Sequence, residues 1–115
     1  MDTLEIKNEI SSYIDSKHDF LWNLSNYIHD HAEIGFAEYV TSKKLVDVLK
    51  EDGFKVEEKA GGLDTAFIAT FSTNEVKKPR IDILCEYDAL DLGEALPQGH
   101  QIAHACGHNI IATTG

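Results

Sequence analysis

The spacing of the apolar residues changes once along this 115-residue chain, and this change limits the fold more than any other feature. Over residues 6–28, isoleucine and leucine recur at spacings of three, four and seven, which places them on one face of a helix. Asp2 and Glu5 form a capping-box pattern before it. From Phe54 onward, apolar and polar residues alternate, as is typical of a strand. The chain is therefore expected to belong to the α/β class.

Two helices are predicted before the spacing changes. The first is expected to run from near Asp2 to near His31, because Gly35 follows closely. The second is expected over residues 37–50, and Gly53 stands where a left-handed residue would end it. Its expected buried face consists of Val40, Leu45, Val48 and Leu49.

Three strands are predicted after the helices. Residues 54–59 alternate in the manner of an exposed or edge strand, and the apolar run 65–71 resembles a strand covered on both faces. Residues 80–86 form the third strand. The polar loop 72–79 is short for a parallel crossover, so an antiparallel meander is favoured. Because residues 109–115 only begin a further helix, the sheet is expected to be unfinished.

Composition excludes several classes of partner and location. The chain has 20 acidic and 10 basic residues, a formal net charge of −10, so neither nucleic acid nor an anionic membrane is expected to bind. No apolar run approaches the roughly 20 residues that span a bilayer. The start of the chain lacks an apolar signal segment. Cys85 and Cys106 are therefore expected to be free thiols in the cytoplasm.

The residues that best indicate chemistry are HACGHN, at positions 104–109. Thiolate and imidazole are both good ligands for zinc and similar divalent ions. Cys106 and His108 are two residues apart and would not share a helix face, but Gly107 permits a turn that brings both to one ion. The alternative is a small buried cysteine beside a surface histidine, and the motif alone leaves both interpretations open.

Other polar residues near this motif have competing explanations. His100, His104 and His108 are spaced by four, but Gly107 argues against a continuous helix, so the spacing is interpreted as coincidence. Asp88 follows the third predicted strand, where it would either orient a histidine ligand or begin a turn.

Two further groups are interpreted as structural. Cys85 is interpreted as a core residue of the third strand. The polar cluster at residues 29–33 lies at a helix end, where the helix dipole accounts for its histidines.

Three motifs in order resemble a known family. They are HAEIGF at residues 31–36 followed by Glu38, LCEYDAL at residues 84–90, and HACGHN at residues 104–109. Together they resemble the amino-terminal part of metallopeptidase family M-twenty. The likeness is to its amidohydrolase branch, which holds aminobenzoyl-glutamate hydrolase, hippurate hydrolase and the auxin-conjugate hydrolases. It covers essentially the whole chain but about the first quarter of a family member.

The resemblance implies a fold and a metal site. Residues 1–115 would be the amino-terminal part of a catalytic domain, a partial zinc-peptidase-like α/β/α sandwich with a mixed sheet. The remainder of that domain and a lid or dimerisation domain would be absent, and the full-length protein would be a homodimer. Two divalent ions, zinc or manganese, are implied, with Cys106 and His108 as ligands. Asp88 and His104 would be supporting residues.

The resemblance also implies a reaction. A metal-activated water would attack the amide carbonyl of an N-acyl amino acid or dipeptide-like substrate, with a glutamate as general base. That glutamate is expected beyond Gly115, so no catalytic residue is assigned here and the chain alone is predicted to be inactive. The alternative function is a non-catalytic metal-binding or interaction module of the same fold.

The chain departs from the family pattern in two places. Ala32 follows His31 where the family has proline, and Asp91 interrupts the family's Asp-Ala-Leu-Pro. The second departure lengthens the loop before His104 and affects the placement of Asp88.

Overall fold

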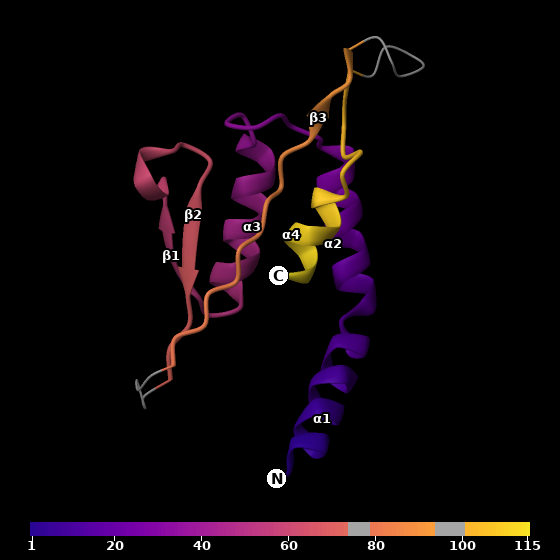
Figure 1. Ribbon diagram of the computed structural model, residues 1–115, viewed down its shortest axis with the longest axis vertical. Coiled ribbons are helices and arrows are strands. Elements are labelled where there is room, and N and C mark those ends of the chain that lie inside the picture. Colours follow the sequence, from indigo (N-terminus) through magenta and orange to yellow (C-terminus); the bar gives the residue numbers. More distant parts are fainter. Residues whose placement is uncertain (74–78, 94–100) are drawn as a thin grey trace.

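The computed structural model describes residues 1–73, 79–93 and 101–115 and shows a mixed α/β chain (Figure 1). Its elements are α1 (Thr3–Ser16), α2 (His18–Asp30), α3 (Tyr39–Glu51), β1 (Lys55–Glu58), the 3-10 helix η1 (Ala60–Gly62), β2 (Phe67–Thr70), β3 (Leu90–Asp91), β4 (Ile102–Ala103) and α4 (His108–Thr114). The strands form two antiparallel pairs, β1–β2 and β3–β4. Within the described ranges these pairs make neither a mixed sheet nor a three-layer sandwich, so only the α/β class is confirmed.

The structure has two helices where one long helix was expected, so the prediction of a single continuous helix was wrong. The capping box is confirmed, because the Asp2 carboxylate accepts from the Glu5 N–H at 2.8 Å and the Glu5 carboxylate accepts from the Asp2 N–H at 2.9 Å. α1 ends at Ser16, whose hydroxyl donates to the Tyr13 carbonyl at 2.6 Å. Such bonds from a side chain to the preceding turn compete with the helix ladder and bend helices. α2 then begins at His18.

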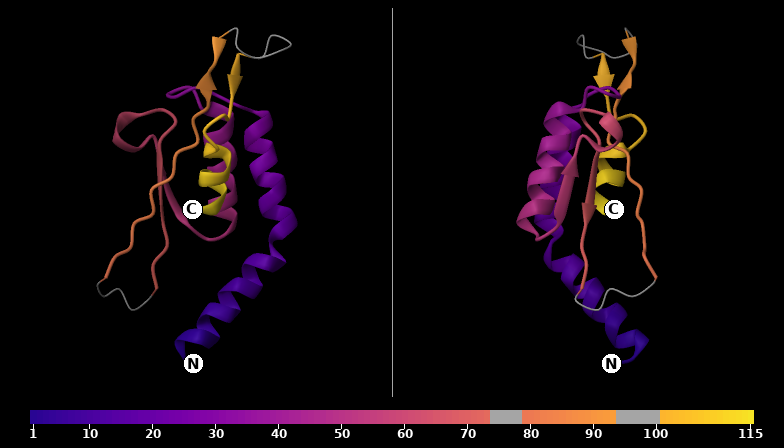
Figure 2. Two further views of the ribbon diagram at one scale, coloured as in Figure 1. Left: turned by 45° about the vertical axis from the view of Figure 1, so that its right-hand side comes forward. Right: turned by 90° about the vertical axis from the view of Figure 1, so that its left-hand side faces the viewer.

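The small core lies between α2 and α3. Leu24, Ile28 and Leu45 form its buried centre, and Ala112 of α4 packs against it. Ile28 is completely buried. α2 supplies two of the three central residues, and both α3 and α4 pack against it through this core (Figure 2).

α3 matches its predicted range closely but turns a slightly different face inward. Leu45 is buried as expected, whereas Val40 is 42% exposed and Val46 is buried in its place. The helix ends as predicted, with Gly53 at a φ of +93° directly after the last turn. Helical spacing therefore identified the inward side but missed its centre by about one residue.

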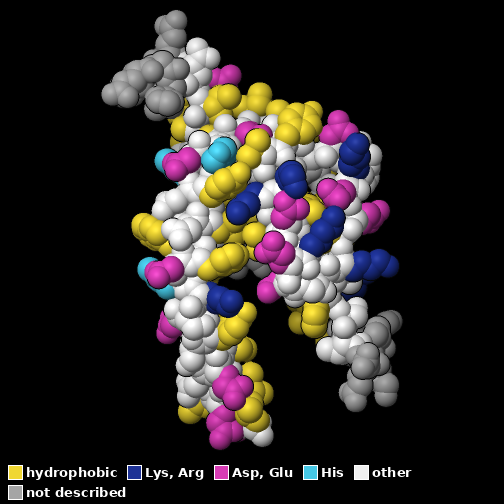
Figure 3. Space-filling view, turned by 180° about the vertical axis from the view of Figure 1, so that it is seen from behind, with side chains coloured by type: hydrophobic (Ala, Val, Ile, Leu, Met, Phe, Trp, Pro, Cys, Tyr) yellow, Lys and Arg dark blue, Asp and Glu magenta, His cyan; other side chains and the backbone are white. Residues whose placement is uncertain are grey.

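α1 projects from the rest of the molecule and contains no buried residue. It makes the described chain elongated, with extents of 54 × 33 × 22 Å. Figure 3 shows hydrophobic side chains along one side of this projecting helix. The exposed large hydrophobic residues of α1 are Leu4, Ile6, Ile10, Tyr13 and Ile14. No helix in the described part of the chain is long and apolar enough to cross a membrane.

The sheet departs from the prediction after its first strand. β1 pairs with β2 in the register Lys55↔Thr70 to Glu58↔Phe67, which confirms two of the strands and their antiparallel sense. β2 is not covered on both faces, because Ile68 is 48% exposed and Phe71 beyond it is 64% exposed. The run 65–71 is therefore apolar without being enclosed by the described residues.

The predicted third strand, residues 80–86, is wrong as a strand. The segment is extended (Figure 1) but pairs with no strand among the described residues, and Ile81 and Leu84 are 81% and 91% exposed. Apolar residues favour a strand only where a hydrogen-bonding neighbour is available. Cys85 is exposed as well, which overturns its interpretation as a core residue. The short hairpin of β3 and β4 was not predicted, and residues 74–78 of the polar loop before the segment lie outside the described residues.

Candidate functional site

The first two family-like motifs lie side by side in the structure. The Ala89 N–H donates to the Glu33 carbonyl at 2.7 Å, and Ile34 and Ala89 form an isolated parallel bridge. Ala89 is 5% exposed. The chain just after α2 therefore holds the residue that follows Asp88, and so positions Asp88.

Glu33 also organises the start of α3. Its carboxylate accepts from the backbone N–H groups of Val40 and Thr41 at 2.9 and 2.8 Å. These donors have no partner within the helix, and a carboxylate at a helix amino terminus is favoured by the helix dipole. Glu33 thus has a structural role that the sequence did not reveal. The interpretation of the cluster at residues 29–33 as a helix end agrees with the position of His31, whose Nδ1 lies 2.7 Å from the Tyr27 carbonyl at the end of α2.

Asp88 and His108 meet although they are 20 residues apart. Nδ1 of His108 lies 2.7 Å from Oδ1 of Asp88 and 3.1 Å from the Asp88 carbonyl. Both acceptors favour the tautomer with the proton on Nδ1, which leaves the lone pair on Nε2. The His108 side chain is 24% exposed and the Asp88 side chain 38% exposed, so the pair lies at the edge of solvent. Of the two interpretations of Asp88, this contact favours orientation of a histidine.

Gly107 has the conformation that the motif requires. Its φ is +73°, in the left-handed region that glycine adopts at little cost, and it lies directly before α4. Cys106 therefore lies in the turn outside the helix, and His108 is the first helical residue. Cys106 is exposed and His108 is partly buried, which contradicts the alternative of a buried cysteine beside a surface histidine.

His104 lies between β4 and the turn at residues 105–106, so it does not share a continuous helix with His108, as expected. Both of its ring nitrogens are buried, and no partner for either is found among the described residues. Burial lowers the pKa of His104, and the nearby His29 and His108 lower it further. This shift favours the neutral form of the ring. His100, the third histidine of the series, lies outside the described residues.

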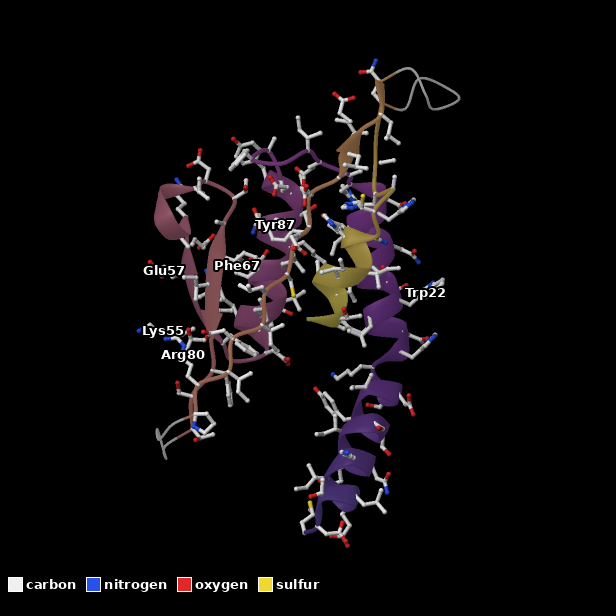
Figure 4. All side chains as sticks on the ribbon, in the orientation of Figure 1. Trp22, Lys55, Glu57, Phe67, Arg80 and Tyr87 are labelled. Carbon is white, nitrogen blue, oxygen red and sulfur yellow. The ribbon has the colours of Figure 1, made fainter. Side chains whose placement is uncertain are left out.

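Tyr87 is a residue near the site that the sequence analysis missed. Its hydroxyl donates to the Thr65 carbonyl, and its ring stacks on Phe67 of β2 with centroids 6.0 Å apart (Figure 4). Burial raises the pKa of Tyr87 to about 12, with the carboxylates of Glu38 and Glu33 adding to the effect. The neutral phenol therefore ties the chain directly before Asp88 to the sheet. Its sequence signal was only an aromatic residue at the end of an apolar run.

The sequence analysis also gave no separate role to Asn109. It is 8% exposed, and its Nδ2 donates to the Ser25 hydroxyl of α2 at 3.2 Å. Nothing in the sequence singles out Ser25, which is 84 residues away.

The donor atoms suit part of a metal site. An exposed thiol and an imidazole whose Nε2 carries the lone pair are ligands that zinc and related ions accept. Over the ranges that the structure describes, no three His, Cys, Asp or Glu side chains gather closely enough to hold an ion. Cys106 and His108 therefore offer donor atoms of a suitable chemical type, without a complete ligand set among the described residues.

Comparison with curated proteins finds relatives of one kind, although no family model matches the chain. The chain is 33% identical to one subunit of the p-aminobenzoyl-glutamate hydrolase of Escherichia coli, over 95% of this chain and 24% of that protein. It is 30% identical to thermostable carboxypeptidase 2 of Saccharolobus solfataricus, over 95% and 28%. With hippurate hydrolase of Campylobacter jejuni the identity is 32%, over 89% and 27%. The chain spans about a quarter of the length of these relatives.

Proposed function

This chain belongs to the M-twenty type of amidohydrolases, and on that premise we propose that it supplies part of the metal site of a metal-dependent amidohydrolase. The observation that carries the proposal is the contact of His108 Nδ1 with the Asp88 carboxylate at 2.7 Å. Histidine ligands are commonly oriented by a carboxylate on the ring nitrogen that does not bind the metal.

The proposal assigns a role to each residue of the site. Cys106 and His108 would hold a divalent ion of the zinc or manganese class through Sγ and Nε2. Asp88 would hold the Nδ1 proton, which fixes the ring and makes Nε2 a stronger donor. His104 would support the turn as a neutral ring. When two such ions are bound, they supply polarisation of an amide carbonyl and activation of a water.

The rest of the machinery is placed in the part of the relatives that this chain does not span. The proposal assigns residues 1–115 to the amino-terminal part of an α/β/α catalytic domain. The remaining ligands, a glutamate general base and a lid or dimerisation domain would follow, in a homodimer. The exposed apolar segment at 80–86 supports a larger sheet, because Ile81 and Leu84 would be covered by further strands.

The proposed substrate is an N-acyl amino acid or a dipeptide-like amide. The names of the relatives support this class, since they include an aminobenzoyl-glutamate hydrolase, a hippurate hydrolase and an N-acetylcysteine deacetylase.

Elemental analysis tests the metal site. After dialysis with zinc or manganese, the chain is expected to retain metal, and the Cys106→Ala, His108→Ala double variant is expected to lose it. The matched control is Cys85→Ala with His18→Ala, which removes one exposed thiol and one exposed imidazole outside the motif. Equal metal in the parent and the double variant, or none in the parent, would contradict the assignment.

The chain alone is expected to have no hydrolase activity. A metal site that catalyses hydrolysis has three protein ligands as a rule, and the described residues do not bring three together. The measurement is release of free amino acid from an N-acyl amino acid with added zinc or manganese. Metal-dependent turnover that the Cys106→Ala, His108→Ala variant abolishes would contradict this expectation.

A further inference from the structure

We propose that Asn109 is a positioning residue for His108 and acts through its hydrogen bond to Ser25. The inference rests on the proposed function, because His108 is taken as a metal ligand. It adds that α2, which carries no residue of the motif, sets the direction in which the His108 ring points.

α4 takes its orientation from contacts with the rest of the chain. In proteins most helical stability comes from tertiary packing of one face of the helix and not from propensity. α4 lies beside α2 in Figure 1, and Ala112 packs against the core cluster of Leu24, Ile28 and Leu45.

Asn109 and Ala112 define the face of α4 that meets α2. They are three residues apart, which places them on one side of a helix. His108 precedes Asn109 by one residue and is turned from it by about 100°. The ring consequently faces Asp88, on the chain before β3, while the neighbouring side chain faces α2.

The hydrogen bond between Asn109 and Ser25 restricts the orientation of α4, which apolar packing does not. Contact between Ala112 and the core is non-directional, so it holds α4 close to α2 without setting rotation about the helix axis. The bond from Asn109 Nδ2 to Ser25 Oγ, at 3.2 Å, restricts that rotation because hydrogen bonds weaken steeply away from good geometry. Rotation of α4 would lengthen the 2.7 Å contact between His108 and Asp88.

The test compares Ser25→Ala with Ser25→Thr, and Asn109→Leu with the parent. Nitrogen-15 NMR of the imidazole, recorded without metal, reports which ring nitrogen of His108 carries the proton. We expect one tautomer, protonated on Nδ1, in the parent and in Ser25→Thr, which keeps the hydroxyl. A mixture of tautomers is expected in Ser25→Ala and Asn109→Leu. Thr114→Ala is the control, since its hydroxyl donates to the Ile111 carbonyl within α4.

Metal affinity gives a second measurement on the same variants. Titration with cobalt(II), a spectroscopic substitute for zinc, is expected to show affinity about tenfold weaker in Ser25→Ala and restored in Ser25→Thr. If Asn109→Leu fails to fold, the positioning role is still tested by comparing Ser25→Ala with Ser25→Thr and by the double variant Ser25→Ala, Asn109→Leu. Removing both partners of a buried hydrogen bond is nearly neutral for stability.

The outcomes separate the two proposals. An unchanged His108 tautomer in Ser25→Ala would overturn the positioning role, whatever the chain binds. A parent that binds no cobalt but whose tautomer depends on Ser25 would support the positioning role and remove the proposed metal site.

Discussion

Replacing Ile28 by alanine is expected to lower the free energy of unfolding of this chain by about 2–5 kcal/mol. Ile28 is completely buried and lies between Leu24 and Leu45 at the centre of the core. Truncation removes buried methylene and methyl groups and leaves a cavity that the surrounding helices fill only partly. Small domains have only about 5–15 kcal/mol of stability, so a large fraction would be lost. α3 and α4 both depend on this part of α2.

Urea denaturation followed by circular dichroism measures this loss. The matched control is Ile10→Ala on α1, where the same change is made at a residue that is 55% exposed. A substitution at such a position changes the unfolding free energy by about 0.5 kcal/mol or less. If both variants unfold at the same urea concentration, the core does not lie where the structure places it.

Replacing Asp88 by alanine is expected to weaken metal binding by about 10- to 100-fold. The carboxylate at 2.7 Å from His108 Nδ1 is lost, so Nε2 becomes a weaker donor. The Asp88 carbonyl, 3.1 Å from the same nitrogen, belongs to the backbone and is retained. The Nδ1 proton therefore keeps one acceptor, and the tautomer is expected to persist. This behaviour differs from that of Ser25→Ala, where the tautomer itself should change.

Competition with a chromophoric chelator measures the affinity. Asp82→Ala is the control, because it removes one carboxylate from the same stretch of chain, where Asp82 pairs with exposed Arg80. It is expected to bind metal as the parent does. An equal loss in both variants would indicate a general effect of charge, and no loss in Asp88→Ala would contradict the proposed role of Asp88.

Features that depend on neighbouring residues were predicted well. The capping box of Asp2 and Glu5 closes a single turn, and the left-handed Gly53 and Gly107 follow from the need to end or begin a helix. Each requires only residues within a few positions of one another.

Features that depend on a distant partner were predicted poorly. The run 80–86 has the apolar character of a strand, but no described strand pairs with it, so Cys85 is exposed. Val40 was expected to be buried because its spacing fits, yet it is 42% exposed and Val46 is buried. Spacing gives the inward side of a helix, whereas packing decides its centre.

The α/β class, the ends of most helices, the turn at Gly107 and the motif of Cys106 and His108 can be read from the sequence, because they depend on local backbone chemistry and side-chain identity. The contact of Asp88 with His108 across 20 residues, and that of Asn109 with Ser25 across 84, became known from the folded chain alone. A hydrogen bond between distant residues forms only after apolar burial has brought their elements together, so its partner is not encoded by spacing along the chain.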